Sequence, residues 1–204
     1  MEASEIMQRD DFKSCAAFHG HICGGMAIGY VAAHAGMTWL KSQRALDEEL
    51  VAIVETDACC VDAIQVLTGC TFGKGNLIFR DYGKMCFTFF NRASGKGVRL
   101  AMKSDSFQTN PRQMELFGKA RAKTITETEQ TELQQLMQNR TKELLEADAK
   151  DLFDMQEITE ALPDKARIAP SKACAKCGEP TMETKLERLA GEMVCRGCLA
   201  TVTR

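Results

Sequence analysis

The sequence predicts an α+β protein in which helices flank a mixed β-sheet and a small four-cysteine zinc domain follows. Between residues 22 and 102, apolar patterns of helical spacing alternate with short β-branched runs. After residue 171, two Cys-x2-Cys pairs lie in a segment too short to fold around an apolar core of its own. We therefore expect two domains, residues 1–165 and 172–204. Residues 160–171 would link them, because Pro163 and Pro170 interrupt helix formation there.

The first half of the chain predicts the sheet and its covering helices. Alanine and methionine at helical spacing predict a mostly buried helix over residues 22–42, and the apolar run 50–54 predicts an interior strand. Residues 58–68 fit a helix that Asp57 caps and Gly69 ends. Strands are expected at 76–80 and 84–91, joined by the turn at 81–83, and at 98–102.

The second half of the chain is predicted to be mainly helical up to the linker. Pro111 marks a helix start, and Met114, Leu116 and Phe117 are its expected buried side. Thr126 and Glu129 have capping-box spacing at the start of a longer helix. That helix has an apolar face made of Leu133, Leu136, Met137, Leu144 and Leu145. Such a face is either core or a subunit interface, and we expect a homodimer.

Composition restricts the classes of function. The 204 residues carry a net charge of -2, which argues against nucleic acid as a partner. No apolar run reaches the ~20 residues of a membrane span, and the start lacks the pattern of a signal peptide. We therefore expect a cytoplasmic protein without a membrane contact. Ten cysteines in a reducing compartment are then better explained as metal ligands, reactive thiols and small buried residues than as disulfides.

The C-terminal cysteines have the spacing of a structural zinc site. Cys174 and Cys177 form one Cys-x2-Cys pair, and Cys195 and Cys198 form the other, with 17 residues between the pairs. Four thiolates complete a tetrahedron and leave no position for substrate. We expect zinc to hold this small domain together.

A second group of metal-binding side chains lies near the N-terminus. His19, His21 and Cys23 fall within five residues, directly before the predicted helix 22–42. Cys59 and Cys60 stand just after the interior strand, at the start of the next helix. Imidazole and thiolate are ligands for zinc and other transition metals, and a site with three protein ligands keeps one position open. Whether Cys59, Cys60 or Cys23 supplies the thiolate remains open at this point.

The two segments that carry these residues resemble the family of E-type subunits of formylmethanofuran dehydrogenase. FHGHICGG at residues 18–25 is similar to the family's FHGHxCPG motif, and residues 57–84, which begin DACCVDAIQ, resemble its second signature. The resemblance covers about residues 12–120. Gly24 stands where the family usually has proline, and Cys60 where glycine is common.

The resemblance implies an α+β core, a metal site near the HGHxC motif and an association with molybdenum or tungsten formylmethanofuran dehydrogenase in one-carbon metabolism. The tail resembles the treble-clef finger appended to some members. We expect His19 and His21, with Cys59 and Cys23, to hold zinc or another transition metal in a metal-dependent enzyme or oxidoreductase subunit acting on a small molecule. Asp62 could orient one of the histidines. The alternatives are a metal or cofactor carrier that serves a molybdenum or tungsten enzyme, and a zinc-finger interaction module.

Overall fold

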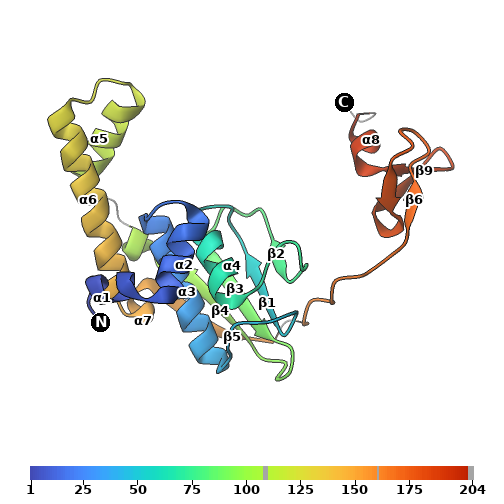
Figure 1. Ribbon diagram of the computed structural model, residues 1–204, viewed down its shortest axis with the longest axis horizontal. Helices are drawn as coiled ribbons and strands as arrows, with labels where there is room; N and C mark the ends of the chain where they lie inside the picture. The colour runs from blue at the N-terminus through green and yellow to red at the C-terminus, as the bar shows by residue number, and fades with distance from the viewer. Residues whose placement is uncertain (108–109, 160, 202–204) are drawn as a thin grey trace. The chain divides into compact units, whose positions relative to one another are not determined.

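The computed structural model describes residues 1–107, 110–159 and 161–201 (Figure 1). Residue 160 of the predicted linker and the last three residues of the predicted zinc domain lie outside the described residues. The chain divides into two compact units, Met1–Lys165 and Ala166–Arg204. Among the described residues, none of the helices has the length and apolar character needed to cross a membrane.

The first unit is built on a five-stranded mixed sheet in the order β2-β1-β3-β4-β5. Its strands are β1 (Leu50–Val54), β2 (Leu77–Phe79), β3 (Cys86–Asn91), β4 (Gly97–Met102) and β5 (Phe153–Ile158). β1 and β2 run parallel, whereas β1–β3, β3–β4 and β4–β5 are antiparallel pairs. The predicted α+β class with a mixed sheet is therefore confirmed.

Helices cover one face of this sheet and continue beyond its edge (Figure 1). They are α1 (Ala3–Gln8), α2 (Asp10–His19), α3 (Gly24–Leu40), α4 (Cys60–Thr68), α5 (Pro111–Arg121), α6 (Glu127–Glu146) and α7 (Ala149–Leu152), with a 3-10 turn at Ser104–Phe107. The main core lies between α3 and the sheet, where Met26, Val54, Phe87 and Leu100 are almost fully buried. A smaller apolar cluster of Val51, Ile53 and Phe90 belongs to a separate group of side chains.

Two glycines allow α3 to pack closely on its neighbours. A Cβ on Gly29 would lie 2.1 Å from the carbonyl oxygen of Cys60 in α4. A Cβ on Gly36 would lie 2.3 Å from the ring of Phe89 in β3. Real Cβ atoms do not approach other atoms so closely, so the backbone of α3 reaches both neighbours only because these positions lack side chains.

Two local predictions about the first half were wrong. Strands 76–80 and 84–91 do not form a hairpin, because β1 lies between β2 and β3 in the sheet. The helix after β1 is capped at Cys59 without a side-chain hydrogen bond, so Asp57 is not its cap. Gly69 does end this helix, in the left-handed conformation.

The second half matches its predictions in the helix starts and departs from them in burial. Pro111 is the first residue of α5, and Thr126 and Glu129 form a complete capping box on α6. Leu116 is buried, but Met114 and Phe117 are 57% and 40% exposed. Those two residues therefore do not belong to the core of the described chain.

The second unit is a small domain of two hairpins and a short helix. Its elements are β6 (Ser171–Ala173), β7 (Pro180–Met182), a 3-10 turn (Glu183–Lys185), β8 (Leu186–Leu189), β9 (Glu192–Cys195) and α8 (Arg196–Ala200). β6 pairs with β7 and β8 pairs with β9, both antiparallel. Only Cys174, Leu186 and Val194 form its buried cluster among the described residues, so an apolar core of this size cannot account for its folding.

Candidate metal centre

A helix–turn–helix segment brings the N-terminal histidines and Cys23 together. α2 ends at His19, and Gly20 reverses the chain with φ of 89°. Cys23 is the N-cap of α3, where its Sγ accepts a hydrogen bond from the backbone N–H of Met26 at 3.4 Å. The end of one helix and the start of the next thus hold both histidines and the thiol at a single turn.

The three side chains are close enough to share one metal ion. One ligand atom from each of His19, His21 and Cys23 lies within 4.8 Å of the others. Nε2 of His19 is 3.7 Å from Sγ of Cys23, and the two imidazole rings have centroids 4.4 Å apart. Two imidazoles and a thiol form a donor set suited to zinc or another borderline-soft metal.

Asp62 fixes the orientation of His19. Nδ1 of His19 lies 2.7 Å from Oδ2 of Asp62, which projects from the first turn of α4. The ring N–H at Nδ1 can donate to the carboxylate, which leaves Nε2 as the free acceptor on the side of Cys23. A carboxylate behind a histidine in this way is the usual support of a metal-binding imidazole.

Cys59 lies beside Cys23, but Cys60 does not. A Cβ on Gly25 would stand 3.7 Å from Sγ of Cys59 and 3.9 Å from Sγ of Cys23. Partial burial, together with the neighbouring Cys23, raises the pKa of the Cys59 thiol. Cys60 is fully buried, its Sγ lies 3.7 Å from the carbonyl oxygen of Ala58, and burial raises its pKa to about 12.

The geometry thus narrows the choice of thiolate. Cys23 joins the two histidines directly, and Cys59 is adjacent to Cys23. Cys60 points into the core and is removed from this group. We call His19, His21 and Cys23, with Cys59 beside them, the core cluster.

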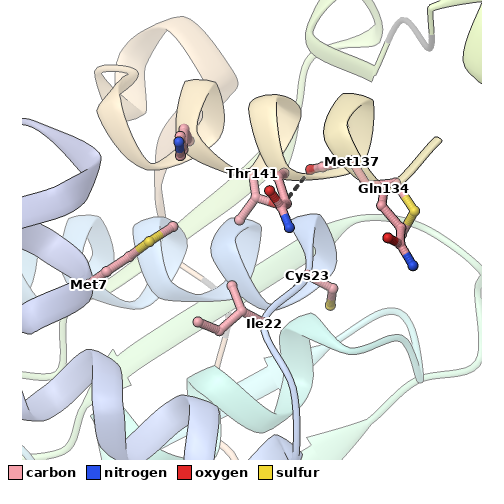
Figure 2. A pocket seen from close by; sticks show the side chains of 8 residues that line it. Met7, Ile22, Cys23, Gln134, Met137 and Thr141 are labelled. Atoms are coloured by element: carbon pink, nitrogen blue, oxygen red, sulfur yellow. Dashed lines mark hydrogen bonds between the residues drawn. The ribbon is translucent and has the colours of Figure 1, made fainter. Parts of the chain in front are cut away.

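Two clefts border the core cluster. One has a volume of about 590 Å³ and lies between α6 and the turn that carries Cys23 (Figure 2). The other, of about 410 Å³, is lined by His19, Cys59 and Asp62 together with Phe72 and Phe79. A ligand in either cleft would touch a member of the cluster. Sequence analysis missed the α6 wall, because its residues follow the motif by more than 100 positions and show only a helical pattern.

The C-terminal cysteines form a second, distinct group. One Sγ from each of Cys174, Cys177, Cys195 and Cys198 lies within 4.8 Å of the others. Sγ of Cys174 accepts hydrogen bonds from the backbone N–H groups of Lys176 and Cys195 at 3.4 and 3.2 Å. Backbone hydrogen bonds, that of Cys177 first, lower the pKa of Cys174 to about 6 and so favour its thiolate. This group fits a four-sulfur zinc finger, as the spacing predicted.

Other residues considered from the sequence have structural partners. Nζ of Lys74 donates to the backbone carbonyls of Leu46 and Asp47 at 3.3 and 2.9 Å, so the glycine-rich turn around it holds its lysine within the fold. His34 lies 3.2 Å from Asp11, away from the core cluster. Three further cysteines are buried: Cys15, Cys70 and Cys86.

Comparison with known proteins places this geometry in a family. The model of a family described as "FmdE, Molybdenum formylmethanofuran dehydrogenase operon" matches residues 18–154, which is most of the chain and includes the whole core cluster. The chain belongs to the FmdE family. The resemblance seen in FHGHICGG and in residues 57–84 is thereby confirmed.

Two relatives set the extent of this similarity. A protein of Archaeoglobus fulgidus described as a probable S-adenosyl-L-methionine-binding protein is 32% identical over 178 residues, covering 83% of this FmdE chain and 48% of the relative. The FmdE chain thus spans about half the length of that protein. A crystal structure of an FmdE-like protein of tungsten formylmethanofuran dehydrogenase, from Syntrophus aciditrophicus, aligns with a TM-score of 0.62 at 20% identity, covering 99% of this chain and 94% of that one. The second comparison supports the fold alone.

Proposed function

We propose that this FmdE protein is a metal-dependent enzyme, or a subunit of one, that acts on a small molecule at the core cluster. The observation that carries the proposal is the convergence of His19, His21 and Cys23 within 4.8 Å, with Asp62 behind His19 and a cleft on either side. Zinc or another transition metal fits these donors. Cys59 is a fourth ligand or a free thiol next to the ion.

The residues of the chain have separate tasks in this proposal. His19, His21 and Cys23 would hold the ion, Asp62 keeps Nδ1 of His19 protonated and its Nε2 available, and Gly25 leaves room for both thiols. A bound ion would supply Lewis-acid polarisation of a substrate oxygen or of a water molecule. The four C-terminal cysteines would hold a structural zinc in a treble-clef finger.

The biological setting follows from the family. The description of the matching family names a molybdenum formylmethanofuran dehydrogenase operon, and the description of the structural relative names a tungsten enzyme. Both support a role beside a molybdenum or tungsten enzyme in one-carbon metabolism. A homodimer is part of the proposal, because Met114 and Phe117 leave an apolar strip exposed on α5.

Cobalt substitution tests the open position at the core cluster. In a Cys174→Ser/Cys177→Ser variant, added Co²⁺ is expected to bind the core cluster and to produce thiolate-to-cobalt absorption. Azide should then shift the visible bands, since an exchangeable position accepts an outside ligand. A variant that binds no Co²⁺, or a spectrum that azide leaves unchanged, would contradict the proposal.

The exposure of His21 favours the carrier alternative as a second candidate. A carrier must release its ion, and a ligand at the surface can be replaced by an incoming chelator. Transfer of the core ion to a weak chelator within seconds, without turnover of any small molecule, would favour a carrier. Retention over hours would favour the enzyme.

A further inference from the structure

The larger of the two clefts has two chemically different walls. We call it the α6 cleft. One wall is a stripe of α6, and the other comes from α1 and the turn before α3. The α6 wall consists of Gln134, Met137, Gln138, Thr141 and Lys142, and the facing wall of Met7, Ile22 and Cys23. Figure 2 shows Gln134 and the sulfur of Cys23 toward one end of the view and Met7 toward the other, with Ile22 and Thr141 between them.

Apolar side chains in the α6 cleft are open to solvent. Ile22 is 49% exposed and Met137 is 38% exposed, and Met7 is half-buried beside them. Exposed apolar groups that gather in a concave site gain free energy when a ligand covers them. Methionine side chains also adapt to ligands of different shape.

The polar side chains of the α6 wall are free to bind a ligand. Within the described ranges of the chain, Gln134, Gln138 and Lys142 form no hydrogen bond or ion pair through their side chains. Their neighbours on α6 are engaged: Gln135 bonds to Asn139, and Arg140 pairs with Glu143. None of the described residues that line the α6 cleft is acidic. Lys142 therefore gives the α6 cleft a positive charge.

The α6 cleft is long enough to separate two functional ends of a ligand. Gln134 and Lys142 are eight residues apart in one helix, which corresponds to roughly 12 Å along its axis at about 1.5 Å per residue. Cys23, a member of the core cluster, lines the same space. A ligand could thus pair with Lys142 and still present its other end to the core cluster.

We propose that the α6 cleft binds an amphipathic organic anion, an elongated small molecule with a carboxylate at one end. The carboxylate pairs with Lys142, the apolar middle lies on Met7, Ile22 and Met137, and the opposite end reaches Cys23. The side-chain amides of Gln134 and Gln138 hydrogen-bond polar groups along the molecule. This inference names the substrate class of the activity proposed above and rests on it.

Calorimetric titration of the full-length, zinc-loaded protein tests the anion and its partner. Octanoate is expected to bind more tightly than octanamide, which has the same chain without the charge. Lys142→Gln should weaken octanoate about fivefold, the effect of a solvent-exposed ion pair, and should leave octanamide unchanged. Met137→Glu should abolish octanoate binding, because it places a like charge on the apolar wall.

Lys13→Gln is the matched control, since Lys13 is exposed on α2 and does not line the α6 cleft. It should bind octanoate as the unaltered protein does. Equal binding of octanoate and octanamide, or equal effects of Lys142→Gln and Lys13→Gln, would overturn the inference. Circular dichroism of each variant verifies that it is folded.

A thiol-bearing probe separates this inference from the proposed metal function. 8-Mercaptooctanoate should bind more tightly than octanoate to zinc-loaded protein, because its thiolate reaches the ion, and should lose this advantage in metal-depleted protein. If octanoate depends on Lys142 but the thiol adds nothing in either protein, the anion cleft stands and the core metal fails. If the thiol adds affinity and Lys142 has no effect, the metal function stands and the anion cleft fails.

Discussion

At the scale of single residues, the bond between Asp62 and His19 links the two segments that carry the family motifs. His19 ends α2 and Asp62 lies in the first turn of α4, so their 2.7 Å contact joins side chains 43 positions apart in sequence. It sets both the tautomer and the direction of the imidazole. Without it, His19 could rotate away from Cys23 while the fold stayed intact.

Replacement of Asp62 should therefore weaken the core site without unfolding the chain. Asp62→Asn is expected to lower zinc affinity at the core cluster by about 10- to 100-fold, as loss of a supporting carboxylate does in other metal sites. Competition titration against a chromophoric chelator, in the Cys174→Ser/Cys177→Ser background, measures the change. Asp57→Asn is the control, since Asp57 lines the neighbouring cleft without a bond to either histidine. Equal affinities of the two variants would remove Asp62 from the site.

A second residue-scale prediction concerns Asp11 at the start of α2. Hydrogen bonds from Arg9, above all, hold the pKa of Asp11 at about 2, and the Tyr30 hydroxyl also donates to it. Because this value is below the ~3.9 of an unfolded aspartate, the stabilisation is complete above about pH 4 and is lost as pH falls toward 2.

Asp11→Asn should consequently destabilise the protein at pH 7 and lose this effect in acid. We expect about 1–2 kcal/mol at pH 7, discounted because Arg9 is largely in solvent, and a difference that shrinks as pH approaches 2. Urea unfolding in the presence of a chelator, which keeps metal release out of the comparison, gives the values. Asp10→Asn serves as the neighbour control. A difference that stays constant from pH 7 to pH 2 would show that ionisation of Asp11 is not the cause.

How much of the site was predictable depends on sequence distance. His19, His21 and Cys23 come together through one local turn, so the sequence itself indicated their proximity. The position of Cys59 next to Cys23, and the burial of Cys60, depend on how α4 docks against α3. That docking is a tertiary property, which local patterns do not contain.

At the scale of elements, the close contact of α3 and α4 positions the two halves of the site. The Cys60 carbonyl lies where a side chain on Gly29 would be, and the adjacent Cys59 then borders Gly25 in the first turn of α3. Any added atom at Gly29 must push α4 away and carry Cys59 and Asp62 with it.

Gly29→Ala is expected to destabilise the fold and to weaken metal binding together. Overpacking of a tight contact costs about 1–3 kcal/mol, which should appear as a lower thermal midpoint and a weaker core site. Gly118→Ala, on α5, is the contrasting substitution, because a Cβ there meets nothing within 4 Å. It should raise stability by up to about 1 kcal/mol. A Gly29→Ala protein as stable as the unaltered chain would refute the close packing.

The misplaced hairpin has a physical explanation at the same scale. Two short β-branched runs separated by three residues favour a hairpin by proximity alone. Here β2 instead pairs in parallel with β1 through the crossover helix α4, and β3 pairs with the other edge of β1. The interior strand β1, the helix ends at Gly69 and Pro111 and the α6 capping box followed from local chemistry and were predicted correctly.

At the scale of the whole molecule, the two units depend on different sources of stability. The first buries a large apolar core between its sheet and helices. The second has only three residues in its buried cluster, within the residues described, together with four converging thiols. Metal binding should therefore supply most of the folding free energy of the second unit.

Removal of zinc should unfold the C-terminal unit alone. A strong chelator, or Cys174→Ser/Cys177→Ser, is expected to expose residues 166–201 to rapid amide hydrogen exchange while the sheet of the first unit keeps its protection. Hydrogen exchange measured peptide by peptide distinguishes the two units. Cys70→Ser offers a comparison, since Cys70 is buried in the first unit and should leave protection of the tail unchanged. Protection of the tail that survives chelation would mean that metal does not hold it.

The central claim, a core ion distinct from the zinc of the tail, is tested most directly by an element-specific metal count with ligand distances from X-ray absorption. The full chain should hold two ions, and the Cys174→Ser/Cys177→Ser variant one. In that variant we expect nitrogen ligands at about 2.0–2.1 Å and sulfur at about 2.3 Å in one coordination shell. A single ion per chain bound by four sulfurs, with none left in the variant, would contradict the account.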